Sequence, residues 1–116
     1  MQLTLPEFPN AIAEFERRLN LQNRQISTLL AAIVEIEGEV DGKIAFDANL
    51  KNDAQRKAKR TELLAESFYQ KCLADCEEAQ DRRREVEIEL ERLHNLFTIA
   101  KLQMRHATAQ LEQAIA

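Results

Sequence analysis

The stretch from Ala65 to Ala114, AESFYQKCLADCEEAQDRRREVEIELERLHNLFTIAKLQMRHATAQLEQA, decides the fold that the sequence predicts. Steps of alternating four and three residues reach fifteen positions, of which fourteen are apolar. These seam positions are Ala65, Tyr69, Cys72, Cys76, Ala79, Arg83, Val86, Leu90, Leu93, Phe97, Ala100, Met104, Ala107, Leu111 and Ala114. A repeat of 3.5 residues keeps one stripe of a helix facing a partner helix. The stretch therefore predicts a long helix over residues 67–115 with a coiled-coil seam.

The N-terminal part of the chain carries a matching seam. Nine of its ten positions are apolar, and they are Phe8, Ile12, Phe15, Leu19, Gln22, Ile26, Leu29, Ile33, Ile36 and Val40. Pro6 and Pro9 suit a first helical turn, where a missing N–H costs nothing. The pattern predicts a first helix over residues 8–40, preceded by an irregular lead-in over residues 1–7.

Between the two seams the helical period is lost. Gly38 weakens the end of the first helix and Gly42 can supply a left-handed residue beyond it, so we expect a loop over residues 41–51. Asn52 with Gln55 has the spacing of a capping box, which predicts a short helix over residues 53–65.

A second capping-box spacing stands before the long helix. Ser67 and Gln70 are three residues apart, and this favours a break between the short helix and the long one. The alternative is one continuous helix over residues 53–114 with Ser67 inside it.

The predicted fold class is all-α. It is a single domain, residues 1–116, built as an antiparallel coiled-coil helical hairpin with a short third helix at the turn. If Val40 lies near Ala65, residue numbers that face one another sum to about 105. Gln22 then lies opposite Arg83, and a matched polar layer of this kind commonly fixes the register of a coiled coil.

Composition supports helix and excludes several classes of protein. The 116 residues are 31% charged and include only two Gly, two Pro and no Trp, which favours helix over sheet. The longest apolar run, Leu29–Val34, falls far short of the roughly 20 residues that a membrane span needs. No basic stretch followed by an apolar one marks a signal peptide. We therefore expect no membrane association and a cytoplasmic location.

No group of residues has the spacing of a catalytic or metal site. Cys72 and Cys76 both fall on the seam, where small buried thiols are the expected interpretation. His94 and His106 are too far apart for a helical metal pair. Glu91 with His94 matches the Glu-x-x-His spacing of di-iron bundles, but the facing helix has no second copy. The sequence predicts no catalytic residue, no cofactor and no metal, and hence not an enzyme.

One segment is strongly basic. The segment 51–60, KNDAQRKAKR, has a net charge of +4, whereas residues 1–50 and 61–116 each have −4. It could contact a nucleic-acid backbone or a protein partner through Lys51, Arg56, Lys57, Lys59 and Arg60. The alternative is an internal role, in which the segment neutralises the acidic residues Glu35, Glu37, Glu39 and Asp41 across the turn. We call residues 51–60 the basic segment.

The unequal lengths of the two predicted helices point to self-association. At 1.5 Å per residue the long helix spans roughly 72 Å and the first one roughly 50 Å, so the end of the long seam lacks a partner. Exposed apolar patches usually mark an interface. The expected oligomer interface consists of Ile88, Ile99, Leu102, Met104 and Leu111, and the simplest assembly is a dimer with a four-helix bundle. The alternative is a frayed C-terminal helix with singly exposed apolar residues.

The segments LKNDAQRKAKRTELLAESFYQ and EVEIELERLHNLF carry a resemblance. Over residues 49–105 the chain resembles a group of small helical coiled-coil proteins from phages and prophage-like elements. In that group the break often carries Asp-Pro before the aromatic residue, whereas this chain has Glu66, Ser67 and Phe68. The resemblance implies a genetic context of recombination and single-strand binding, without an established activity.

These patterns predict a non-enzymatic coiled-coil protein that assembles with itself or with a protein partner. The alternative is an accessory protein of DNA recombination or replication that contacts nucleic acid through residues 51–60. A co-chaperone like prefoldin fits less well, because residues 41–51 are too few for the two β-hairpins of that fold.

Overall fold

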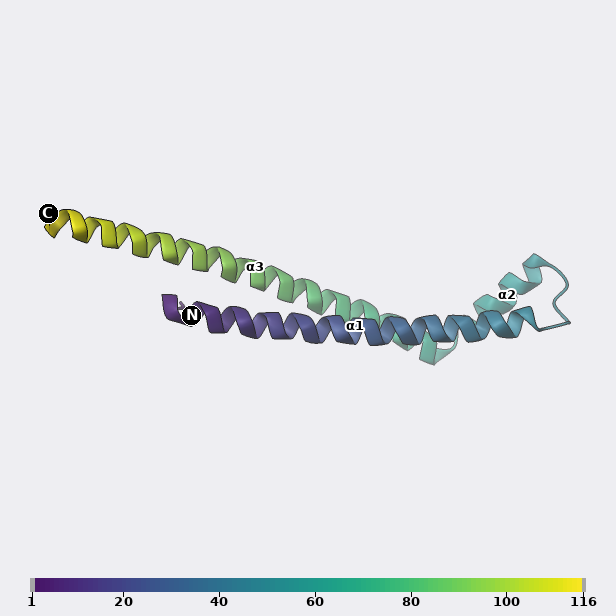
Figure 1. Ribbon diagram of the computed structural model, residues 1–116. Coiled ribbons are helices and arrows are strands. Elements are labelled where there is room, and N and C mark those ends of the chain that lie inside the picture. The colour runs from purple at the N-terminus through teal and green to yellow at the C-terminus, as the bar shows by residue number, and fades with distance from the viewer. Residues whose placement is uncertain (1, 116) are drawn as a thin grey trace. The chain divides into compact units, whose positions relative to one another are not determined.

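The computed structural model describes residues 2–115, and every regular element in that range is helical. A 3₁₀ turn η1, Leu5–Glu7, precedes the helices α1, Phe8–Ala45, α2, Asp53–Leu64, and α3, Ser67–Ile115 (Figure 1). Contacts divide the chain into unit 1, Met1–Leu21 with Arg83–Ala116, and unit 2, Gln22–Arg82. The helices α1 and α3 contribute to both units, and α2 belongs to unit 2.

Unit 1 is built around an aromatic pair. The rings of Phe8 and Phe97 stack with centroids 5.4 Å apart and an angle of 18° between their planes. Phe8 is buried together with Ile12 and Leu93, and Leu3 packs against this cluster. The pair joins the first turn of α1 to α3.

The N-terminal residues are more regular than the sequence analysis predicts. The side chain of Glu7 accepts hydrogen bonds from both the backbone N–H and the hydroxyl of Thr4. These bonds close η1, and Thr4 holds the pKa of Glu7 below its ordinary value by donating them. The expected irregular lead-in was therefore wrong for residues 5–7. The Thr4–Glu7 spacing, which matches a capping box, was the signal for this turn.

Unit 2 has its own apolar core. The buried residues of this core are Ile26, Ile33, Tyr69, Cys72, Cys76 and Ala79. Ala79 is the most buried of them, with no exposed surface at all. Cys72 and Cys76 are free thiols buried in this core, as their seam positions predict. Apart from Tyr69, the core therefore sets large side chains of α1 against small ones of α3.

The register of the hairpin agrees with the predicted one. In unit 1, Phe8 and Phe97 have numbers that sum to 105. In unit 2, the Tyr69 hydroxyl donates to Glu37 Oε1, and Arg82 Nε donates to Gln22 Oε1. Their numbers sum to 106 and 104. The all-α helical hairpin with a short third helix at the turn is confirmed.

The first helix continues beyond its predicted end. It runs through Gly38 and Gly42 to Ala45, so the prediction of a loop from residue 41 was wrong for residues 41–45. Neither glycine has a positive φ. A glycine inside a helix costs about 0.5–1 kcal/mol relative to alanine but does not by itself end the helix. The helix ends where the Asp47 side chain accepts a 2.9 Å hydrogen bond from the Asn49 N–H, a local turn that competes with helix.

Asn52 begins α2 as a side-chain cap. Its Oδ1 accepts a 2.9 Å hydrogen bond from the Gln55 N–H. The second half of the predicted capping box differs, because the Gln55 side chain accepts from the N–H of Lys51 and not from that of Asn52. Two hydrogen bonds, from the Lys51 N–H to the Gln55 side chain and from the Gln55 N–H to the Asn52 side chain, therefore fix the backbone at the start of the basic segment.

The helices α2 and α3 are separate. The first ends at Leu64, one residue before the predicted end, and the second begins at Ser67. The Gln70 side chain donates a 2.9 Å hydrogen bond to the Leu64 carbonyl. This bond satisfies one of the carbonyls that the end of α2 leaves without an intrahelical partner.

Candidate functional site

Arg60 connects the basic segment to α1. Its Nε donates a 2.8 Å hydrogen bond to Asp41 Oδ1, and this contact raises the pKa of Arg60, with Glu37 adding to the effect. Glu37 itself accepts the 2.6 Å hydrogen bond from Tyr69, which raises the pKa of that phenol. Two carboxylates of α1 therefore contact the next two helices: Asp41 binds Arg60 of α2, and Glu37 binds Tyr69 at the start of α3. Asp41 plays the internal role that the sequence offered as an alternative for the basic segment.

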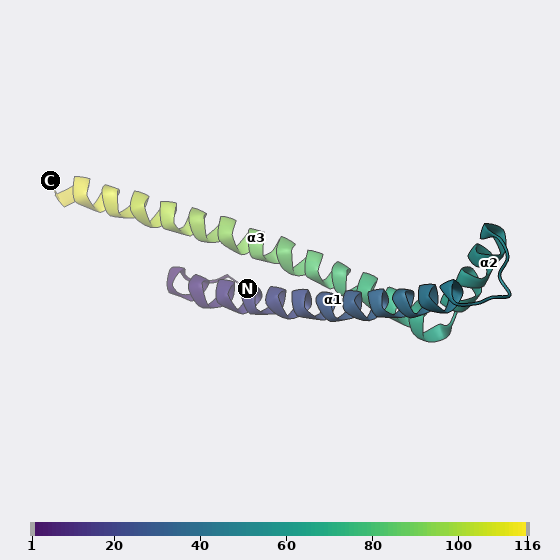
Figure 2. The ribbon, with the colours of Figure 1, turned by 45° about the vertical axis from the view of Figure 1, so that its right-hand side comes forward.

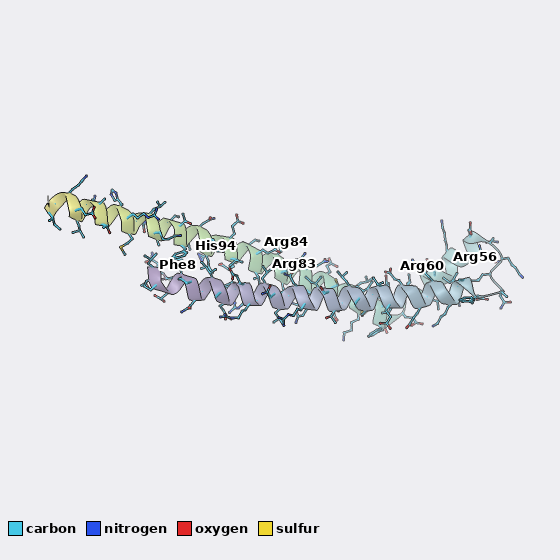
Figure 3. All side chains as sticks on the ribbon, viewed as in Figure 1. Phe8, Arg56, Arg60, Arg83, Arg84 and His94 are labelled. Atoms are coloured by element: carbon cyan, nitrogen blue, oxygen red, sulfur yellow. The ribbon has the colours of Figure 1, made fainter. Side chains whose placement is uncertain are left out.

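Two further cations of the basic segment are paired along α2 itself. Arg56 forms a 2.9 Å ion pair with Asp53, and Lys59 Nζ lies 3.5 Å from a carboxylate oxygen of Glu62. Arg56 and Arg60 are both on α2 (Figure 3). These pairs are exposed, so each contributes little to stability.

Lys51 and Lys57 are the exposed cations of the segment that no carboxylate in residues 2–115 pairs. Unit 2 also has a depression of about 360 Å³, which Leu63 of α2 lines. Its charged lining consists of Glu35, Glu39, Lys43 and Glu66. The surface around α2 is therefore mixed in charge, and the structure does not gather the five predicted contact residues into one free cationic site.

The polar layer of the hairpin differs from the predicted one in one partner. Gln22 accepts a 3.3 Å hydrogen bond from Arg82, the residue before the predicted Arg83. Arg83 lies within 3.6 Å of Glu87, one turn further along α3. Arg83 and His94 are both on α3 (Figure 3).

All the predicted oligomer-interface residues are on α3 in unit 1, and all are exposed. Their exposed fractions are 55% for Ile88, 49% for Ile99, 55% for Leu102, 53% for Met104 and 64% for Leu111. Within unit 1 the end of α3 runs past the start of α1 in both views (Figures 1 and 2). Every described residue of α3 after Ala100 is exposed. We call residues 101–115 the tail.

These apolar residues lie on two sides of α3. Leu102 and Met104 are two residues apart, which places them about 200° from each other around a helix. Met104, Ala107 and Leu111 continue the seam beyond Ala100, and we call them the seam strip. Ile88, Ile99 and Leu102 form a second line, which we call the outer strip.

A groove of about 430 Å³ lies beside the last covered turns of the seam in unit 1. Its apolar lining consists of Leu3, Phe8, Leu93, Leu96, Ile99 and Ala100. The heptad pattern did not predict this groove, because Leu96 lies beside the seam and Leu3 lies in the lead-in. Leu96 is 37% exposed, so the groove remains open to a further side chain.

Metal-binding clusters and membrane-spanning helices are both absent from residues 2–115. No three His, Cys, Asp or Glu side chains in that range are placed to hold a metal ion. None of the helices described there combines the length and apolarity of a membrane span.

Comparison with known proteins adds no relative. No family model matches the chain, and neither the curated proteins nor the solved structures include a match. The class of the protein therefore comes from its own fold, an all-α helical hairpin.

Proposed function

We propose that this protein is a non-enzymatic assembly protein whose helical hairpin associates with a second copy through the exposed apolar residues of α3. The simplest product is a homodimer. In this proposal the hairpin is a scaffold, and the uncovered end of α3 is the functional surface.

The concentration of exposed apolar residues supports this proposal. Of the thirteen large apolar side chains exposed within residues 2–115, six lie in the segment 96–115. They are Leu96, Ile99, Leu102, Met104, Leu111 and Ile115. A single exposed leucine needs no explanation, but a concentration of exposed apolar side chains at one end of a helix usually marks an interaction site.

The seam pattern supports the same surface. Met104, Ala107 and Leu111 keep the spacing that, in the rest of α3, contacts α1. Burying such side chains against a second helix removes apolar surface from water at about 25 cal/mol per Å². Self-association would therefore bury the C-terminal end of the α3 seam against a second copy, as α1 buries its N-terminal part.

Sedimentation equilibrium of the full chain tests the proposal. We expect the wild type to dimerise reversibly with increasing concentration. Two double variants, Ile99→Glu with Leu102→Glu and Met104→Glu with Leu111→Glu, place charges on the outer strip and the seam strip respectively. At least one of them should lower the association constant by about a hundredfold, because a buried unpaired charge is strongly unfavourable.

Val34→Glu is the matched control. Val34 is 66% exposed but lies on α1 in unit 2, so its replacement should leave the association constant unchanged. A wild type that stays monomeric at all accessible concentrations would contradict the proposal. Two double variants that both associate like the wild type would contradict it equally.

The DNA-accessory alternative remains a prediction with less support. Arg56, Lys59 and Arg60 already have carboxylate partners, so phosphate binding would have to compete with those ion pairs. Phosphate contacts give binding that weakens steeply with salt, on the order of one unit of log–log slope per contact. A gel-shift titration at low salt with wild type and an Arg56→Glu, Lys57→Glu, Arg60→Glu variant measures this directly.

A further inference from the structure

We infer that two copies pair antiparallel through their tails, with Leu111 of each seated over Ala100 in the groove of the other. This inference rests on the proposed self-association and specifies its geometry. It assigns the interface to the seam strip and the groove, which Ile99 of the outer strip also lines, and leaves Ile88 and Leu102 of the outer strip outside it.

The order of large and small residues on the seam decides the orientation. From Ala100 onward the seam alternates strictly between alanine and a large side chain: Ala100, Met104, Ala107, Leu111 and Ala114. In a parallel pair each residue meets its own copy, so alanine would face alanine and leave voids. In an antiparallel pair Met104 faces the second copy's Ala107, and Leu111 faces the second copy's Ala100. Only the antiparallel pair sets large against small in every layer, as close packing requires.

Unit 2 already uses this packing. Ala79 of α3 shares a buried cluster with Ile26 of α1, and the register places the two at the same level. Ala79 has no exposed surface and Ile26 is 5% exposed. A small residue of α3 facing a large residue of an antiparallel helix thus makes a well-buried layer in unit 2.

The groove completes the fit. Antiparallel pairing at this register carries the second copy's Leu111 to the level of Ala100 and its Ile115 to the level of Leu96. Ala100 and Leu96 both line the groove, whose other apolar walls are Leu3, Phe8, Leu93 and Ile99. The groove therefore receives the end of the second tail, where Ile115 is 84% exposed in the single chain.

The charges of the tail favour the same orientation. Lys101 lies near its beginning and Glu112 near its end, whereas Arg105 lies at the middle of the pair, level with the second copy's His106. Antiparallel pairing brings each basic beginning close to the other copy's acidic end, twice by symmetry. Parallel pairing would put like charges side by side, which is unfavourable at this range.

The size of the interface limits its strength. The contact involves about ten residues on each side, below the 20–30 of a standard stable interface. We therefore expect a dimer in reversible exchange with monomer, with a dissociation constant on the order of micromolar. Such an interface responds to single charge substitutions in its central layers.

Engineered cysteines read the orientation directly. The two native cysteines are buried, so a cysteine placed on the tail is the only exposed thiol. A mixture of Leu111→Cys and Ala100→Cys chains should form a mixed disulfide dimer under mild oxidation, because the two positions face each other. Leu111→Cys alone should stay uncross-linked, since its two copies are separated by eleven residues of rise, roughly 16 Å.

A second measurement separates the two strips by sedimentation. The Met104→Glu, Leu111→Glu variant should raise the dissociation constant by about a hundredfold. Leu102→Glu is its matched control, equally exposed but on the opposite side of α3, and should leave the constant within about twofold.

The outcomes distinguish this inference from the proposed function. Efficient self-cross-linking of Leu111→Cys indicates a parallel pair and overturns the inference, although self-association stands. Loss of the dimer in Leu102→Glu, with none in the seam-strip variant, overturns it in the same way. A monomeric wild type overturns both proposals.

Discussion

Phe8 and Phe97 stack with ring centroids 5.4 Å apart, and Phe8 is the first residue of α1. Lys101, one turn beyond Phe97, places its Nζ 4.5 Å from the centroid of the same ring. The aromatic pair therefore lies at the level where α1 begins and where the covered part of the α3 seam ends. Unit 1 depends on this contact to hold the first turn of α1 against α3.

Phe8→Ala should destabilise unit 1. Phe8 is 4% exposed, and truncating a buried Phe typically costs 3–5 kcal/mol, so we expect a loss of about 3 kcal/mol at this helix end. Urea unfolding followed by circular dichroism measures the loss. Phe46→Ala is the control, because Phe46 is 92% exposed and its removal should change stability by less than about 0.5 kcal/mol. Equal effects of the two variants would contradict the assigned role of Phe8.

Tyr69 should titrate above its ordinary range. Its hydrogen bond to Glu37 favours the protonated phenol and raises its pKa above 10.0, the ordinary value. Because the folded pKa is raised, the stabilisation is complete below pH 10 and is lost as pH rises through the folded pKa. Tyr69 is the single Tyr of the chain and there is no Trp, so the phenolate absorbance follows this group alone.

Glu37→Gln provides the comparison for that titration. The amide oxygen still accepts the hydrogen bond, but the negative charge that disfavours the phenolate is gone. We expect the midpoint of the Tyr69 titration to fall towards that of the urea-unfolded chain. A wild-type midpoint that already equals the unfolded value would mean that the hydrogen bond does not form in solution.

Ala79→Leu should overpack the core of unit 2. Ala79 has no exposed surface and lies level with Ile26, so a larger side chain forces the two helices apart. Insertions of this kind cost about 1–3 kcal/mol. Ala74→Leu adds the same atoms at an exposed position of α3 and should be nearly neutral. Thermal unfolding of the two variants should show a lower melting temperature for Ala79→Leu alone. An unchanged melting temperature for Ala79→Leu would count against tight packing at this layer.

Asn52→Ala should shorten α2. The Asn52 side chain accepts the Gln55 N–H, and replacing such a cap by alanine costs about 1 kcal/mol. Native-state hydrogen exchange of the α2 amides should accelerate accordingly. Asn23→Ala is the control, because Asn23 is exposed inside α1 and caps no helix. It removes the same kind of side chain and should leave the exchange rates of the α2 amides unaltered.

The periodic part of the fold could be predicted from the sequence, because the seams alone fix which residues of α1 and α3 meet. The contact of Phe8 with Phe97 follows directly from that register. The identity of polar partners does not follow. A period locates the side of a helix that faces its neighbour, whereas Arg82, beside the seam, reaches Gln22 through the length of its side chain.

The candidate surfaces likewise include features that the sequence period predicts and features that it does not. The exposure of Met104 and Leu111 follows from the unequal lengths of the two helices. The groove does not follow from periodicity, because Leu3, which precedes η1 and belongs to no helix, lines it through tertiary packing. The ion pairs of the basic segment, such as Arg60 with Asp41, likewise depend on how α2 packs within unit 2.

Gly38 and Gly42 occupy helical positions where nothing lies within 4 Å of an added Cβ, so alanine would fit at both. Each glycine leaves its helical turn about 0.5–1 kcal/mol weaker than alanine would. The final turns of α1 should therefore open more often than the rest, on the timescale that amide exchange reports. Asp41 lies between the two glycines and holds Arg60, so each opening also releases α2 from its carboxylate partner. The exchange rates of these two segments should rise and fall together.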